Sequence, residues 1–165
     1  AMLLAESYFK QDLYNEGMKV CSEVMALPAS PMFEKGKAEA KQKMNLYTNN
    51  KIATLQQAND FDGIITMAEG LDNQALAQKI TVQAYLLKKD YDKVIELGEA
   101  AAEAQTDEED KSLIYYTIGA AYNAKYNAGG NKDESLKNKV VEYMSKVIAG
   151  NAVEGAKAAI ADLTK

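Results

Sequence analysis

Two stretches of the chain repeat one pattern of residues, and this repeat constrains the fold more than any other feature. Residues 60–69 read DFDGIITMAE and residues 90–99 read DYDKVIELGE. In each stretch an Asp able to cap a helix is followed by an aromatic residue and then by an apolar helical face. The segment between them, Ala75–Lys88, has apolar residues at helical spacing. The pattern predicts an array of helix, tight turn and helix.

The rest of the chain indicates an all-helical fold, because Ala, Lys, Glu, Gln, Leu and Met are abundant and no segment alternates apolar and polar residues. We expect nine helices. Two follow Asp60 and Asp90, one occupies Ala75–Lys88, and the other six are predicted at Met2–Lys10, Leu13–Leu27, Pro31–Gln57, a segment that opens at Thr106 and runs to Asn127, Lys132–Ala149 and Ala152–Leu163.

Helix starts are predicted from capping residues. Ser30 with Pro31 is a typical start, and Thr106, Asn131 and Asn151 are each followed three residues later by Glu, as in a capping box. Gly150 is expected as a left-handed C-cap. On the first helix, Leu4 and Tyr8 are expected to face the core.

Composition excludes several chemistries. The 165 residues include no His and no Trp, all 19 basic residues are Lys, and the net charge is -5. Without imidazole or guanidinium groups, neither a histidine base nor an arginine clamp can be built, so we expect no enzyme, no metal site and no cofactor. The acidic balance argues against nucleic acid as a partner. The single cysteine, Cys21, is expected to be a buried helix residue.

One segment resembles the first helix of the tetratricopeptide repeat (TPR). Tyr115, Ile118, Gly119 and Tyr122 occupy the positions of its W-x2-L-G-x2-Y pattern, and Val140, Met144 and Val147 follow as in its second helix. The resemblance implies a right-handed α-α superhelix of about four helix pairs and a C-terminal capping helix. The spacings differ from the period of 34: Tyr14 to Phe61 is 47 positions and Phe61 to Tyr91 is 30. We therefore expect an irregular array.

The resemblance also implies a concave groove lined by the first helix of each pair. There we expect Asn49, Gln56, Lys79, Gln83, Leu86, Tyr116 and Asn123. Polar members would bond a ligand's backbone, and Leu86 and Tyr116 would anchor apolar groups. The function so predicted is a noncatalytic protein–protein interaction scaffold that binds a peptide or helix of a partner protein.

Three other functions stay open: carbohydrate capture, an accessory role in the cell envelope, and self-assembly through the apolar N-terminal edge at Met2, Leu3 and Leu4. We expect one TPR-like solenoid domain over residues 1–165, which fits the C-terminal part of a longer chain because the first helix starts at once. No membrane insertion is expected, since the longest weakly polar stretch is short. The closing segment is similar to the tails of exported bacterial TPR proteins, so a periplasmic or envelope location is one expectation.

Overall fold

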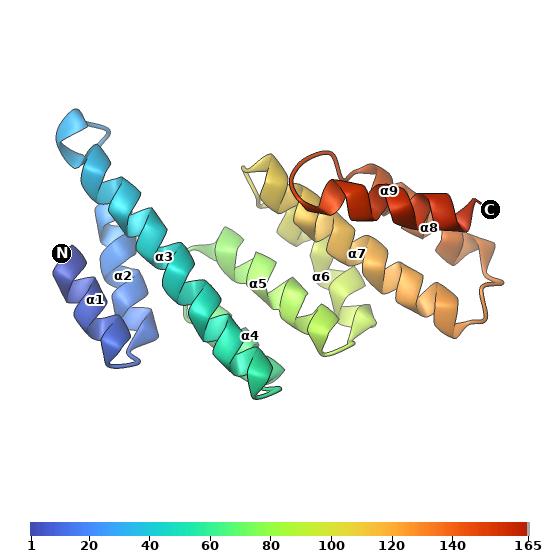
Figure 1. Ribbon diagram of the computed structural model, residues 1–165, viewed down its shortest axis with the longest axis horizontal. Helices are drawn as coiled ribbons and strands as arrows, with labels where there is room; N and C mark the ends of the chain where they lie inside the picture. Colours follow the sequence, from blue (N-terminus) through green and yellow to red (C-terminus); the bar gives the residue numbers. More distant parts are fainter. Residues whose placement is uncertain (165) are drawn as a thin grey trace. The chain divides into compact units, whose positions relative to one another are not determined.

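The computed structural model describes residues 1–164, and within them every regular element is an α-helix. Figure 1 follows them along the chain. The nine described helices are α1 (Met2–Lys10), α2 (Tyr14–Met25), α3 (Pro31–Gln57), α4 (Phe61–Glu69), α5 (Gln74–Leu87), α6 (Tyr91–Glu103), α7 (Glu108–Ala128), α8 (Glu134–Ser145) and α9 (Ala152–Leu163). The all-helical prediction is confirmed, and the bounds of α1, α3 and α9 are those expected.

Two predicted helix starts are wrong, because an aspartate further along the chain provides the cap. Asp107 Oδ1 accepts hydrogen bonds from Glu109 N at 2.9 Å and Asp110 N at 3.1 Å, so α7 is capped by Asp107 and not by Thr106. Asp133 Oδ1 accepts from Ser135 N at 2.9 Å and Leu136 N at 3.2 Å, so α8 starts after Asp133 and not after Asn131. A carboxylate that accepts from two free N–H groups also complements the helix dipole.

Four helix hairpins share one kind of turn. Asp12, Asn59, Lys89 and Gly130 each have a positive φ, of 59°, 54°, 61° and 74°, and they lie between α1 and α2, α3 and α4, α5 and α6, and α7 and α8. Each turn also returns a backbone bond to the helix before it: Leu13 N to Tyr8 O, Asp60 N to Leu55 O, Asp90 N to Tyr85 O, and Asn131 N to Tyr126 O. These bonds close the helices as Schellman motifs do. The predicted repeat of two turns is therefore a repeat of four.

The chain divides into two compact units, Ala1–Ala77 and the part that begins at Gln78, and α5 starts in the first and continues in the second. In the first unit α2 packs against α1 and α3, and α3 also contacts α1 and α4. Ala5 and Phe9 are the buried residues of α1, and Phe9 stacks on Tyr47 with ring centroids 4.0 Å apart. The expected inward position is wrong for Leu4, which is half exposed, whereas Tyr8 is partly buried.

The second unit is built on a core shared by α5, α6, α7 and α8. Val82, Val94, Ile114, Ile118 and Tyr143 are buried in it together with three alanines. Gly98 and Gly119 allow the helices to approach closely: a Cβ on Gly98 would overlap Ile118, and one on Gly119 would lie 2.9 Å from Met144 Cε. Gly119 thus allows Met144 of α8 to pack closely on α7.

Helix α9 covers part of α7 and α8. Its Ala156 is buried with Val140, Met144 and Val147. The connection from α8 is held by Ser112 of α7, whose Oγ accepts hydrogen bonds from Ile148 N at 3.2 Å and Ala149 N at 3.1 Å. Gly150 has the expected positive φ of 75°, but α8 ends earlier, at Ser145, so Gly150 belongs to this connection and is not the C-cap of α8.

Candidate ligand-binding pocket

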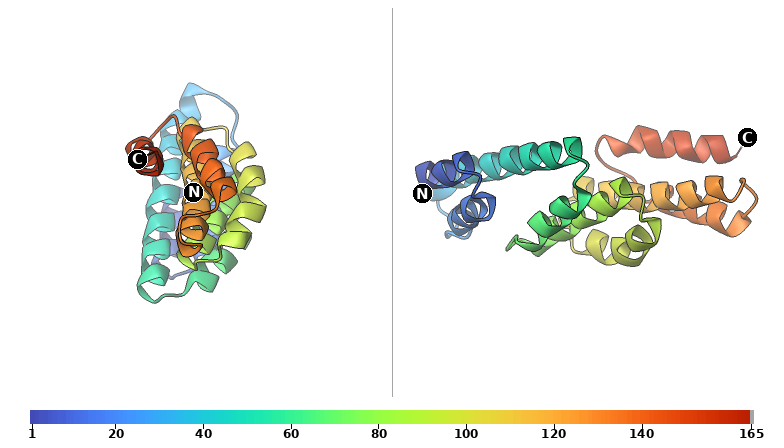
Figure 2. Two further views of the ribbon diagram at one scale, coloured as in Figure 1. Left: turned by 90° about the vertical axis from the view of Figure 1, so that its right-hand side faces the viewer. Right: turned by 90° about the horizontal axis from the view of Figure 1, so that it is seen from below.

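A polar pocket lies at the end of the second unit, between α7, the turn that follows it, and α9. Its volume is about 340 Å³. It is lined by Asn123, Tyr126, Asn127, Asn131, Ala159, Asp162 and Leu163. Figure 2 shows α7 and α9 running side by side in the same direction, so both helices end on this side of the unit. The pocket thus combines amide groups from α7 with a carboxylate and apolar carbons from α9.

The asparagines are positioned by the geometry of α7 and its turn. Asn123 and Asn127 are four residues apart on one helix and therefore share a face. Asn131 follows in the left-handed conformation, with φ 61°, which asparagine adopts more readily than most residues. The buried Tyr126 fixes the turn, because its hydroxyl donates to Asn131 O at 2.9 Å. Each asparagine side chain brings both a carbonyl acceptor and N–H donors to the pocket.

Of the seven residues predicted to line a groove, only Asn123 lines this pocket. Tyr116 lies on the same helix but packs against the apolar cluster of α8 and α9. A Cβ on Gly155 of α9 would lie 3.1 Å from its hydroxyl oxygen. Tyr116, which was expected to anchor a ligand in the groove, is instead partly buried under α9.

The three predicted residues of α5 occupy one face of that helix, with different surroundings. Lys79 Nζ is 2.7 Å from Asp110 Oδ1, and this ion pair joins α5 to α7. Gln83 is half-buried, and Leu86 packs against the core of the second unit. Lys79 and Gln83 retain polar groups at the surface, whereas Leu86 has a packing role as well.

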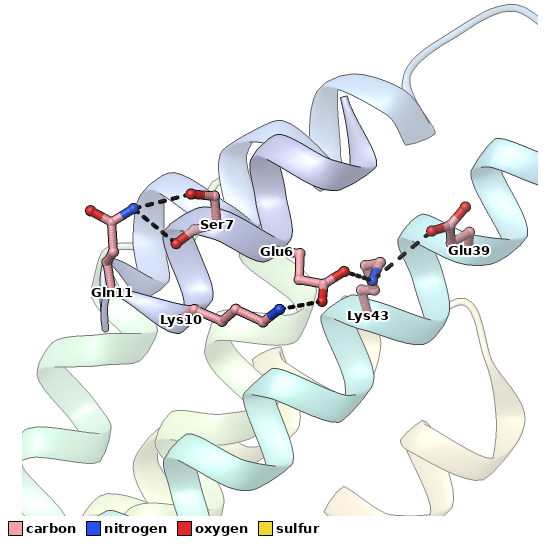
Figure 3. Close-up of polar contacts among 6 residues, drawn as sticks. All are labelled: Glu6, Ser7, Lys10, Gln11, Glu39 and Lys43. Carbon is pink, nitrogen blue, oxygen red and sulfur yellow. Dashed lines mark hydrogen bonds and ion pairs between the residues drawn. The ribbon is translucent and has the colours of Figure 1, made fainter.

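The two remaining predicted residues, Asn49 and Gln56, are exposed on α3 in the first unit. Figure 3 shows a polar network in that unit, where Glu6 of α1 reaches both Lys10 and Lys43. Both N–O distances are 2.9 Å, and Lys43 also lies 3.9 Å from Glu39. Hydrogen bonds from Lys10 and Lys43 lower the pKa of Glu6 to about 2. The network ties α1 to α3.

Sequence reasoning missed Asn127, Asn131 and Asp162 as pocket residues. The signal for two of them is the spacing, since Asn123, Asn127 and Asn131 recur every four residues. Asp162 carried no such signal, because only packing of α9 on α7 places it opposite the asparagines.

Cys21 is buried in α2, and burial raises the pKa of its thiol. Among residues 1–164 no group of cysteine, aspartate and glutamate is arranged to hold a metal ion. Over the same residues, no helix combines the length and apolar character needed to cross a bilayer.

Comparison with known proteins adds no relative. No family model matches the chain, and neither a curated protein nor a solved structure does.

Proposed function

We propose that the chain is a noncatalytic scaffold of TPR-like helix hairpins that binds a segment of a partner protein. The asparagine-lined pocket between α7 and α9 carries this proposal. An asparagine side chain can pair with a peptide unit through both its donor and its acceptor, and three asparagines line one concave site. The repeated Schellman-type turn in four hairpins supports the scaffold part of the proposal.

The size of the pocket favours a single side chain of a peptide over a large ligand. Its volume of about 340 Å³ is at the lower end of the range for small-molecule sites, which is roughly 300–1,000 Å³. A peptide segment can place one side chain there and continue over the polar surface of α7. Ala159 and Leu163 provide apolar contact, and the amides provide orientation.

Selection from a phage-displayed random dodecapeptide library, with the whole chain as bait, tests the proposal. We expect selected peptides to bind the wild-type chain, and Asn127→Ala to weaken their binding about fivefold, as for the loss of one hydrogen bond. Asn49→Ala is the matched control, because Asn49 is exposed on a helix of the other unit. If no peptide is selected, the proposed function is wrong. If Asn49→Ala weakens the peptides and Asn127→Ala does not, the site lies on α3.

A further inference from the structure

The pocket is negatively charged, and binding of a peptide backbone alone does not require that charge. Asp162 is the one residue of its lining with a charge at neutral pH, and that charge is negative. The phenol of Tyr126 already donates its proton to Asn131 O. Asp162 has another interaction within the chain, but a carboxylate offers about four acceptor positions and can take a second donor.

Helix dipoles add to this negative character. α7 and α9 run in the same direction, and the pocket is lined by residues of the last turns of both, Asn127 of α7 and Asp162 of α9. The C-terminal end of a helix has a partial negative charge of about half an electron. Two such ends therefore favour a cation in the pocket.

Three neighbouring positive groups have acidic contacts, whereas Lys132, which follows Asn131 in the same turn, is exposed. Helix α8 starts shortly after Asn131, and its N-terminal end is capped by Asp133 and followed by Glu134. Glu134 in turn lies 3.5 Å from Lys137 Nζ. Lys125, in the last turn of α7, forms an ion pair with Asp92 of α6. Lys132 remains a positive charge beside the turn, so the preference for a cation rests on Asp162 and on the C-terminal ends of α7 and α9.

We infer that the pocket receives the cationic side chain of a lysine or arginine in the partner's segment. The inference rests on the proposed function and specifies what the pocket recognises. The cationic group would donate to the Asp162 carboxylate and to asparagine carbonyls, while its methylene stem would lie on Ala159 and Leu163. A positively charged segment also suits a chain of net charge -5.

Two capped pentapeptides provide the test: acetyl-Gly-Gly-Lys-Gly-Gly-amide and the same peptide with norleucine in place of lysine, which keeps the carbon stem and removes the charge. Titration followed by NMR of the asparagine side-chain amides gives both the site and the affinity. We expect the lysine peptide to bind about tenfold more tightly than the norleucine peptide, as for a charge-assisted hydrogen bond.

Asp162→Asn should reduce that preference to about twofold, because it removes the charge and keeps the shape. Glu154→Gln is the matched control, since Glu154 is an acidic residue in the first turn of α9, paired with Lys157 at 2.8 Å. Circular dichroism checks that both variants keep their helices.

The outcomes separate the two proposals. If library peptides bind and the two pentapeptides show equal affinity, the cation inference is wrong and the proposed function stands. A preference for lysine that Asp162→Asn and Glu154→Gln leave equally strong would also overturn the inference, since the charge would then act elsewhere. If neither the library nor the pentapeptides bind, both proposals fail.

Discussion

The phenol of Tyr143 donates a hydrogen bond to Glu99 Oε1 at 2.5 Å and so joins α8 to α6. The ring is buried and stacks on Tyr122, with centroids 5.5 Å apart, while Lys146 Nζ lies 4.5 Å from its centroid. Burial, together with the carboxylate of Glu99, raises the pKa of Tyr143 well above its ordinary value. This tyrosine therefore connects three helices of the second unit through one polar and several apolar contacts.

We expect Tyr143→Phe to lower the free energy of unfolding by about 1–2 kcal/mol, because it removes a charge-assisted hydrogen bond and keeps the stacked ring. Urea unfolding at pH 7 measures the change. A double-mutant cycle with Glu99→Ala isolates the contact. Additive effects of the two substitutions would show that the bond contributes nothing to stability.

The same substitution should have opposite effects at two glycines. Gly98→Ala places a Cβ against the buried Ile118, so overpacking of about 1–3 kcal/mol should exceed the gain in helix propensity of about 1 kcal/mol. At Gly36 of α3, the new Cβ would meet only Val24 Cγ1 at 3.8 Å, an ordinary contact. Gly36→Ala should therefore raise stability by up to about 1 kcal/mol. Thermal unfolding compares the two variants, and equal shifts would contradict the close approach of α6 and α7.

The sequence predicted the helices better than their ends. Apolar spacing and the Asp caps at 60 and 90 are local signals, so nine helices could be expected in roughly their observed places. Where two capping residues lie close together, as Thr106 and Asp107 do, the choice depends on which side-chain oxygen accepts from the free N–H groups, and here Asp107 Oδ1 accepts from two. The local sequence pattern does not show which of two neighbouring residues will cap the helix.

The faces of the helices that enter the core, and the residues that line the pocket, could not be predicted from local sequence because they depend on contacts between residues far apart in the chain. On α1 the helical periodicity allows either Leu4 or Ala5 to face inward, and the packing of Phe9 on Tyr47 of α3 decides for Ala5. Asn123 was predicted as a binding residue from its position along one helix of the TPR-like pattern. Its neighbours across the pocket come from α9, and no pattern within α7 indicates which helix will lie beside it.

Ser112 should be important for the docking of α9. Ser112→Ala removes the only acceptor that the described structure provides for Ile148 N and Ala149 N, so we expect a loss of about 1–3 kcal/mol and faster hydrogen exchange at both amides. Ser145→Ala is the control, because that exposed hydroxyl donates to Val141 O of its own helix. If the control destabilises the protein as much as Ser112→Ala, the bonds to the connection do not hold α9 in place.

Acid should weaken the first unit through Glu6. Its pKa falls from 4.5 to about 2 on folding, so the folded state favours the charged form. The resulting stabilisation is fully present above pH 4.5 and is lost as the pH falls towards 2. We expect the difference in unfolding free energy between the wild type and Glu6→Gln to shrink over this window, and to be smaller in high salt. Denaturant unfolding at several pH values measures it; a difference that stays constant from pH 6 to pH 2 would exclude the ion pairs with Lys10 and Lys43 as its source.

The shared hairpin turn gives a last prediction, which distinguishes two residues in the same backbone conformation. Lys89 and Asn59 have φ values of 61° and 54°, a region that costs most residues about 1–2 kcal/mol and that glycine adopts freely. Asparagine tolerates this conformation better than lysine does. Lys89→Gly should therefore stabilise the protein by about 0.5–1 kcal/mol, while Asn59→Gly should change stability by less. Both side chains are exposed, so lost packing does not obscure the comparison in urea unfolding. A larger gain at Asn59 than at Lys89 would mean that backbone strain is not what separates the two positions.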